Sequence, residues 1–282
     1  MPGDRLRAGL ERAGDRYRLR VPHDIERAAG YLAGSDQKRA DELNRSLRDP
    51  DVRAVWLARG GYGILRLLPL LDADALRRDP KPIIGFSDAT ALLGWALCAA
   101  GVRGIHGPVV CQLGALPPED AEWLFDLVEG RAAGPLAAEL APTGAPGRGR
   151  IEGPLIGGNL IMLGHLVRTG AFPAMTGALV FVEEVDEKPY SIDRCLTGIE
   201  LAGGLDRVAG ALVGDFTACV DPKYPAPDAL EVVHERLQAY GIAGLGGAPI
   251  GHGRRNRAVP FGGRAALDFD RGTAELLEPA VG

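Results

Sequence analysis

The chain has 282 residues, of which 46% are hydrophobic and 24% charged, as is typical of a folded globular protein rather than a disordered one. Its net charge of −5 disfavours a nucleic-acid-binding protein, whose electrostatic surface would be basic. The N-terminal residues lack the apolar run of a signal peptide, and the longest apolar run is too short to span a bilayer. We therefore expect a cytoplasmic protein without nucleic-acid or membrane partners.

The first part of the chain alternates helical and strand patterns. A helix is predicted after Ser35, which is suited to cap it, and Pro50 marks its end. Strands are predicted over 52–58, 81–87 and 104–110, with a further helix over 64–72. Because strands that alternate with helices form mostly parallel sheets, ligand-binding groups are expected at the carboxyl ends of these strands.

The chain changes character after residue 112. A helix is predicted around 119–128, and the Pro/Gly-rich sequence APTGAPGRGR that follows is typical of a linker. Short strands, glycine turns and helices then alternate, and the tail predicts antiparallel hairpins. The sequence therefore predicts two α/β domains, 1–112 and 151–282, joined by a linker over 113–150.

Ser87 lies where the short apolar strand KPIIGF meets a predicted helix. Such a junction lifts a hydroxyl above a sheet in the nucleophile elbow of hydrolases, next to the positive end of a helix. An ordinary helix-capping serine occupies the same position. The local residues alone favour the cap, although the place of Ser87 at a strand end strengthens the functional interpretation.

The glycine-rich turn RGGYG, residues 59–63, also follows a predicted strand. It lacks the lysine of a phosphate-binding loop and does not match GxGxxG, so no nucleotide cofactor is predicted. Its exposed amides would suit an oxyanion hole, and a simple tight turn explains it equally well. The four cysteines contain no CxxC pair, and neither a metal nor another cofactor is expected.

An acyl-transfer enzyme needs a base and a group that orients this base. His106 and His252 each follow an apolar run and precede a glycine, which would place them at strand ends. The strand LVFV leads into Glu183 and Glu184, of which only one can face a site because neighbours on a strand point to opposite faces. These residues alone leave both choices open. The remaining histidines are interpreted as structural: His23, His165 and His234.

Several segments, in this order, resemble successive motifs of the LD-carboxypeptidases: RGGYG, KPIIGFSDATALL, HGPVV, GPLIGGN, LVFVEEVDEKPYS and GHGRRNRAVPFGG. This serine-peptidase family also contains the microcin C self-immunity peptidases. The resemblance extends from about residue 29 to the end of the chain. It implies an N-terminal domain with a mostly parallel sheet and flanking helices, followed by a mixed α/β, swivelling and barrel-like domain. It also implies a homodimer.

The family carries a Ser-Glu-His triad whose motifs match Ser87, Glu183 and His252. The resemblance thereby favours Glu183 over Glu184, and His252 over His106. The expected oxyanion-hole donors are the backbone N–H groups of two residues, Asp88 and Gly61. The candidates for substrate binding are three cations for a terminal carboxylate and one amide: Arg59, Arg194, Arg255 and Asn159.

The resemblance implies cleavage of the amide between the L-configured centre of diaminopimelate and the terminal D-Ala of a murein tetrapeptide. One alternative is a microcin-immunity-like peptidase that cleaves aminoacyl-nucleotide amides, which the low aromatic content of 6% disfavours. Another is a catalytically silent peptide-binding module. The family usually opens with a β-strand, whereas the first element predicted here is a helix within MPGDRLRAGLERAG, so the first family strand is expected to be missing.

Overall fold

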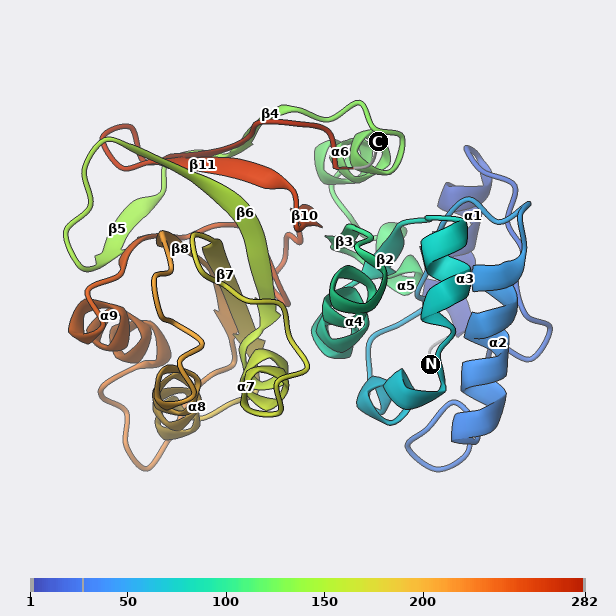
Figure 1. Ribbon diagram of the computed structural model, residues 1–282, viewed down its shortest axis with the longest axis horizontal. Coiled ribbons are helices and arrows are strands. Elements are labelled where there is room, and N and C mark those ends of the chain that lie inside the picture. Colours follow the sequence, from blue (N-terminus) through green and yellow to red (C-terminus); the bar gives the residue numbers. More distant parts are fainter. Residues whose placement is uncertain (1–2, 27, 281–282) are drawn as a thin grey trace.

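The computed structural model describes residues 3–26 and 28–280. The chain forms two sheets flanked by helices (Figure 1), which confirms the mixed α/β fold predicted from the sequence. No helix among these residues combines the length and the apolar character that crossing a bilayer requires.

The smaller sheet contains four strands in the order β1 (Val55–Trp56), β2 (Ile83–Gly85), β3 (Gly104–His106) and β10 (Val259–Phe261). The first three are parallel, and β10 runs antiparallel to β3. The first six helices of the chain belong to this half: α1 (Gly3–Gly14), α2 (Asp36–Arg48), α3 (Ala73–Arg78), α4 (Thr90–Ala100), α5 (Val110–Leu113) and α6 (Pro118–Val128). The predicted cap of α2 is confirmed, because Ser35 Oγ accepts the Lys38 N–H at 3.2 Å.

The predicted strands of this half are shorter than expected: β2 and β3 contain three residues each, and residue 110, predicted to end a strand, begins α5. The predicted helix over 64–72 is replaced by two single 3₁₀ turns, η1 (Ile64–Arg66) and η2 (Leu68–Leu70), because Pro69 has no N–H to continue a helix. The strand predicted over 52–58 is only two residues long. Its ladder consists of a single parallel pairing with β2, its only neighbour among the described strands.

The larger sheet has eight strands in the order β4 (Gly134–Ala137), β12 (Thr273–Leu276), β11 (Arg264–Asp268), β6 (Arg150–Asn159), β7 (Leu179–Val185), β8 (Gly210–Thr217), β9 (Ala243–Gly246) and β5 (Ala141–Gly144). Strands β6 to β9 are parallel, and the flanking strands are antiparallel. Helices α7 (Leu160–Arg168), α8 (Pro189–Leu201) and α9 (Ala229–Ala239) follow the parallel strands. Among the described strands β4 and β5 end this order without pairing with each other, so the barrel-like sheet that the resemblance implied is not closed.

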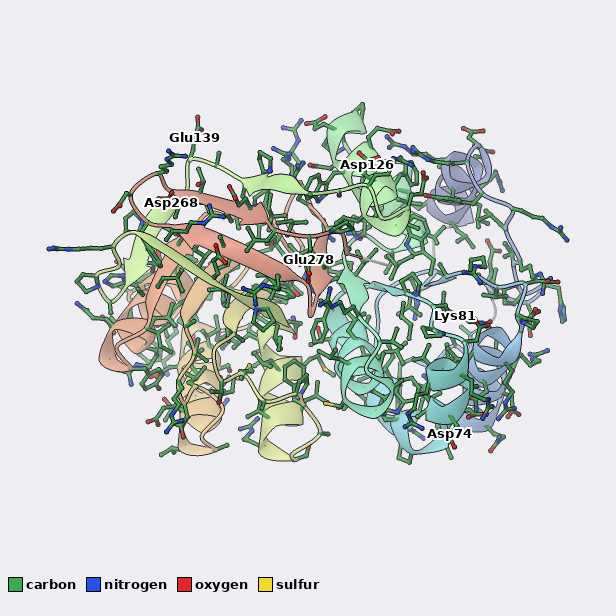
Figure 2. The ribbon with its side chains drawn as sticks, turned by 45° about the horizontal axis from the view of Figure 1, so that its top comes forward. Asp74, Lys81, Asp126, Glu139, Asp268 and Glu278 are labelled. Carbon is green, nitrogen blue, oxygen red and sulfur yellow. The ribbon has the colours of Figure 1, made fainter. Side chains whose placement is uncertain are left out.

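Of the antiparallel hairpins predicted in the tail, the one around Arg271-Gly272 is confirmed by the pair of β11 and β12. The one around Gly262-Gly263 is not formed, because β10 pairs with β3 of the smaller sheet while β11 belongs to the larger sheet. Asp268, at the end of β11 (Figure 2), accepts the N–H groups of Asp270 and Arg271 at 3.1 and 3.0 Å. These side-chain hydrogen bonds close the turn, as aspartate commonly does at such positions.

The segment predicted as a linker, 113–150, contains α6 and two strands of the larger sheet, β4 and β5. Within its Pro/Gly-rich part, Ala141–Gly144 pairs with β9. Pro142 is tolerated there because β5 is an edge strand, where a missing N–H leaves no neighbour unpaired. Local composition predicted a linker, but pairing with a distant strand makes residues 141–144 part of the larger sheet.

Strand β10 carries the chain back from the larger sheet to the smaller one. Its Val259 pairs with His106 of β3, and its neighbour Ala258 accepts the indole N–H of Trp123 on α6 at 2.8 Å. The loop before β10, which contains His252, is therefore held against the smaller sheet.

Helix α1 confirms the predicted helix near the N-terminus. A cavity of about 780 Å³ lies beside it, lined by α1, α2, the segment 18–22 and β1. Because β1 pairs only with β2 among the described strands, its other edge faces this cavity.

Candidate active site

Ser87 begins the 3₁₀ turn η3 (Ser87–Ala89), which leads from β2 into α4. Its φ of +63° lies in the left-handed region, which is rare for a residue other than glycine. Neither η3 nor α4 has a side-chain cap, so the serine does not act as a helix cap. A strained serine between a strand and a helix is the geometry of a nucleophile elbow.

The glycine-rich turn RGGYG lies against this elbow. A Cβ built on Gly60 would be 3.7 Å from the Ser87 Cβ. Buried Asp88 links the two segments, because its Oδ2 accepts the N–H of Ile64 at 2.8 Å. Burial raises the pKa of Asp88, although the hydrogen bond from Ile64 acts in the opposite direction. The predicted donor segments, at Asp88 and Gly61, thus lie around the serine.

Glu183 and Glu184 at the end of β7 point to opposite faces of the sheet, as the alternation of a strand requires. Glu183 is completely buried, and its Oε2 lies 2.6 Å from His252 Nδ1. Burial alone would raise the pKa of Glu183, but the neighbouring His106 and His252 hold this pKa below its ordinary value. Glu183 therefore remains a buried carboxylate that orients one histidine.

Glu184 stabilises the start of α7 instead. Its carboxylate accepts the Asn159 side-chain amide at 2.7 Å, the Ile161 N–H at 2.8 Å and the Val185 N–H at 2.9 Å. Burial raises the pKa of Glu184 to about 7, although these three hydrogen bonds oppose the rise.

Asn159 is the N-cap of α7, because its Oδ1 accepts the Met162 N–H at 3.2 Å. Its backbone N–H donates to Thr90 Oγ1 at 3.1 Å, which ties β6 to the start of α4. The sequence left open whether Asn159 caps this helix or contacts substrate. The structure shows the cap, and its amide is also bound to Glu184.

The two glycines of the GHG motif allow the His252 loop to approach the sheet. Gly251 has a φ of +122°, and a Cβ there would lie 2.7 Å from the Glu183 Cβ. A Cβ on Gly253 would lie 2.1 Å from Asp215 Oδ2. A larger residue at Gly251 would therefore displace Glu183 from the imidazole, and one at Gly253 would collide with the Asp215 carboxylate.

His252 also lies near the nucleophile elbow. The ring centroids of His252 and Phe86, the residue before Ser87, are 4.6 Å apart. With Nδ1 bound to Glu183, Nε2 is the nitrogen available to accept a proton, and the side chain is 18% exposed. No hydrogen bond joins Ser87 to His252 among the described residues, a common situation in catalytic sites without substrate.

Comparison with known families decides what kind of protein carries this site. Residues 3–107 match the LD-carboxypeptidase N-terminal domain, and residues 152–267 match the LD-carboxypeptidase C-terminal domain. The chain belongs to the LD-carboxypeptidase family. It is therefore a serine-type carboxypeptidase, a hydrolase.

Individual relatives agree with this assignment. The chain is 37% identical over 258 residues to the murein tetrapeptide carboxypeptidase of Pseudomonas aeruginosa, an alignment that covers 88% of this chain and 82% of the relative. The solved muramoyltetrapeptide carboxypeptidase of Oxalobacter formigenes matches with a TM-score of 0.82 and 26% identity, covering 98% of this chain and 95% of the other. The microcin immunity protein MccF, solved with glutamyl sulfamoyl guanosine, shares the fold at a TM-score of 0.86 and 23% identity. The match covers 99% of this chain and 92% of MccF.

The three arginines considered for substrate binding in this carboxypeptidase have different surroundings. Arg255 donates from Nε and Nη2 to buried Asp120 at 2.8 and 2.6 Å, so its guanidinium is engaged in an ion pair. The guanidinium carbon of Arg194 lies over the Tyr190 ring, 5.5 Å from the ring centroid. Arg59 is exposed and belongs to the glycine-rich turn beside Ser87.

His106 is the site residue that the sequence did not assign. The resemblance selected His252 as the base, and the structure places His106 on the other side of Glu183, with Nε2 3.7 Å from Oε1. In the sequence, only its position before a glycine at the end of a predicted strand indicated that His106 could belong to the site. This pattern could not show that His106 lies next to Glu183, because Glu183 belongs to a different sheet.

Proposed function

We propose that this carboxypeptidase cleaves the amide between the L-configured centre of diaminopimelate and the terminal D-Ala of a peptidoglycan tetrapeptide, with Ser87, His252 and Glu183 as its triad. The observation that carries the proposal is the 2.6 Å contact between buried Glu183 and His252, next to the strained serine elbow. The carboxypeptidases that this chain resembles support the choice of substrate.

The first half of the reaction forms an acyl-enzyme. Ser87 Oγ attacks the carbonyl carbon while His252 Nε2 takes the hydroxyl proton, and Glu183 stabilises the imidazolium through Nδ1–H. The N–H groups of Asp88 and Gly61 receive the oxyanion. The C–N bond then breaks, and His252 returns the proton to the amine of the departing D-Ala.

The second half restores the enzyme. Water attacks the acyl carbon, His252 takes its proton and then protonates Ser87 Oγ as the ester bond breaks. A substrate with a terminal carboxylate requires a cation near the leaving group. Arg59 is our candidate because it is exposed and its neighbour Gly60 lies beside Ser87.

The test is incubation of the purified protein with L-Ala-γ-D-Glu-meso-diaminopimelate-D-Ala, with release of D-Ala followed by mass spectrometry. The wild type is expected to release D-Ala, and Ser87→Ala is expected to lower kcat at least about 1,000-fold because the nucleophile is lost. Absence of release from the folded wild type would contradict the murein substrate. Tetrapeptide binding without cleavage would instead indicate a peptide-binding module.

A microcin-immunity-like activity is the second candidate. Tyr31 and Tyr62 form an exposed aromatic pair with ring centroids 5.7 Å apart, and Tyr62 belongs to the glycine-rich turn beside the elbow. An exposed aromatic surface is suited to stacking on a nucleobase. Cleavage of glutamyl sulfamoyl guanosine by the wild type, and its loss in Tyr62→Ala with tetrapeptide cleavage retained, would support this activity.

A further inference from the structure

Buried His106 faces the oxygen of Glu183 that His252 does not use. His106 has no exposed surface, and its Nε2 lies 3.7 Å from Glu183 Oε1. Among the described residues neither this nitrogen nor this oxygen has a hydrogen-bond partner. A buried donor and acceptor that face each other are costly to leave unpaired.

The surroundings of His106 are otherwise apolar. Its ring lies edge-on to Phe86 and Phe181, with centroid separations of 6.0 and 5.1 Å. Its backbone pairs with Gly85 on one side and Val259 on the other, which fixes the residue within the smaller sheet. The enclosed ring has no exposed surface through which to exchange protons with a substrate, so this role stays with partly exposed His252.

We propose that His106 is a positioning residue that donates its Nε2–H to Glu183 Oε1. The hydrogen bond requires the two atoms to approach from 3.7 Å to about 2.9 Å. Glu183 is then held between two imidazoles, one on each oxygen, and its Oε2 stays aimed at His252 Nδ1. This inference rests on the proposed function only in assigning Glu183 to orient the catalytic base.

The second donor matters because other groups oppose the charge on Glu183. The titratable groups around it are His106 on β3, His252 in the loop before β10, Glu184 on β7 and Asp215 on β8. The two carboxylates disfavour a further negative charge, and so does burial. A hydrogen bond from His106 keeps Glu183 ionised, as its role beside His252 requires.

The first test needs no substrate. Side-chain ¹H–¹⁵N NMR of the wild type is expected to show the His106 proton on Nε2, with a downfield Nε2–H resonance that moves upfield in Glu183→Gln. The resonance is assigned by its absence from His106→Gln. A neutral His106 ring whose single proton is on Nδ1 would overturn the proposal, because Nε2 could then not donate. This result stands even if the wild type releases no D-Ala, which would contradict the proposed function alone.

The second test compares two variants by kinetics. His106→Gln places an amide donor near the position of Nε2 and is expected to keep kcat/KM within about threefold. His106→Leu removes the donor and is expected to lower kcat/KM about tenfold or more with little change in KM.

The pH profile separates this role from packing. Without the donor the pKa of Glu183 rises, so a smaller fraction is ionised at acidic pH, and the acid limb of kcat/KM for His106→Leu moves to higher pH. His106→Gln is expected to retain the wild-type limb. Equal losses in both variants with an unchanged acid limb would overturn the proposal. If His106→Leu does not fold, the glutamine variant and the NMR measurement decide.

Discussion

At the residue scale, two adjacent glutamates acquire opposite electrostatic properties. Neighbouring imidazoles hold the pKa of Glu183 below its ordinary value, whereas burial raises the pKa of Glu184 to about 7. The difference arises because the strand turns Glu183 toward His252 and Glu184 toward the start of α7. One carboxylate contacts the imidazole of the proposed base, and the other supports the start of the helix beside it.

The raised pKa of Glu184 predicts a pH-dependent stability difference. The unfolded chain loses this proton near pH 4.5 and the folded chain near pH 7, so ionisation favours unfolding as the pH rises between these values. The wild type therefore loses about 3 kcal/mol of stability across this window through Glu184. Glu184→Gln cannot ionise, so its destabilisation relative to the wild type should be larger at pH 5 than at pH 8.

Urea unfolding at both pH values measures this difference. Asp186→Asn, which changes an exposed carboxylate in the same segment, is the control and should leave the free energy of unfolding unchanged. An identical loss at pH 5 and pH 8 in Glu184→Gln would contradict the prediction.

At the element scale, the loop that carries His252 depends on glycines that let it approach β7 and β8. Gly251 adopts a left-handed φ. Because it has no Cβ, the Glu183 side chain can lie where a Cβ of residue 251 would collide with it. The glycines near Ser87 play a similar part, since Gly60 lies directly beside the serine. Catalytic geometry at this scale is set by how closely loops and strands approach.

Gly251→Ala should therefore lower kcat at least about 100-fold, because the added Cβ displaces Glu183 from His252. The backbone strain should also cost about 1 kcal/mol of stability. Gly247→Ala is the matched control, since Gly247 also has a positive φ of +89° but an added Cβ there meets nothing within 4 Å. Steady-state kinetics and thermal unfolding of both variants are the measurements. Equal kcat values for the two variants would rule out the displacement.

At the scale of the whole molecule, the proposed triad spans both sheets. Ser87 follows β2 of the smaller sheet, Glu183 lies on β7 of the larger one, and His252 lies in the loop that returns through β10. Helix α6 secures this return, because its buried Asp120 accepts a bidentate pair of hydrogen bonds from Arg255. Arg257 approaches the same carboxylate at 3.4 Å.

Removal of this carboxylate should weaken the connection. Asp120→Ala leaves two guanidinium groups without their shared partner and is expected to cost about 2 kcal/mol, reduced from a fully buried pair because Arg255 is 43% exposed. The activity should also fall, since the His252 loop loses its anchor. Thermal unfolding and kcat measure the two effects. The control is Glu119→Ala, at an exposed neighbour on α6, which should change neither the thermal stability nor kcat. A wild-type kcat in Asp120→Ala would show that this ion pair does not position the His252 loop.

The sequence by itself determined the order of most helices and strands, the place of Ser87 between a strand and a helix, and the family resemblance. These features depend on local periodicity, turn glycines and short motifs. The tertiary structure alone decided that the segment after α6 joins the larger sheet, that Arg255 pairs with Asp120, and that His106 lies against Glu183. Glu183 and His252 are 69 positions apart, and Arg255 and Asp120 are 135 apart. Contacts over such separations arise from how whole sheets pack, which no local pattern contains.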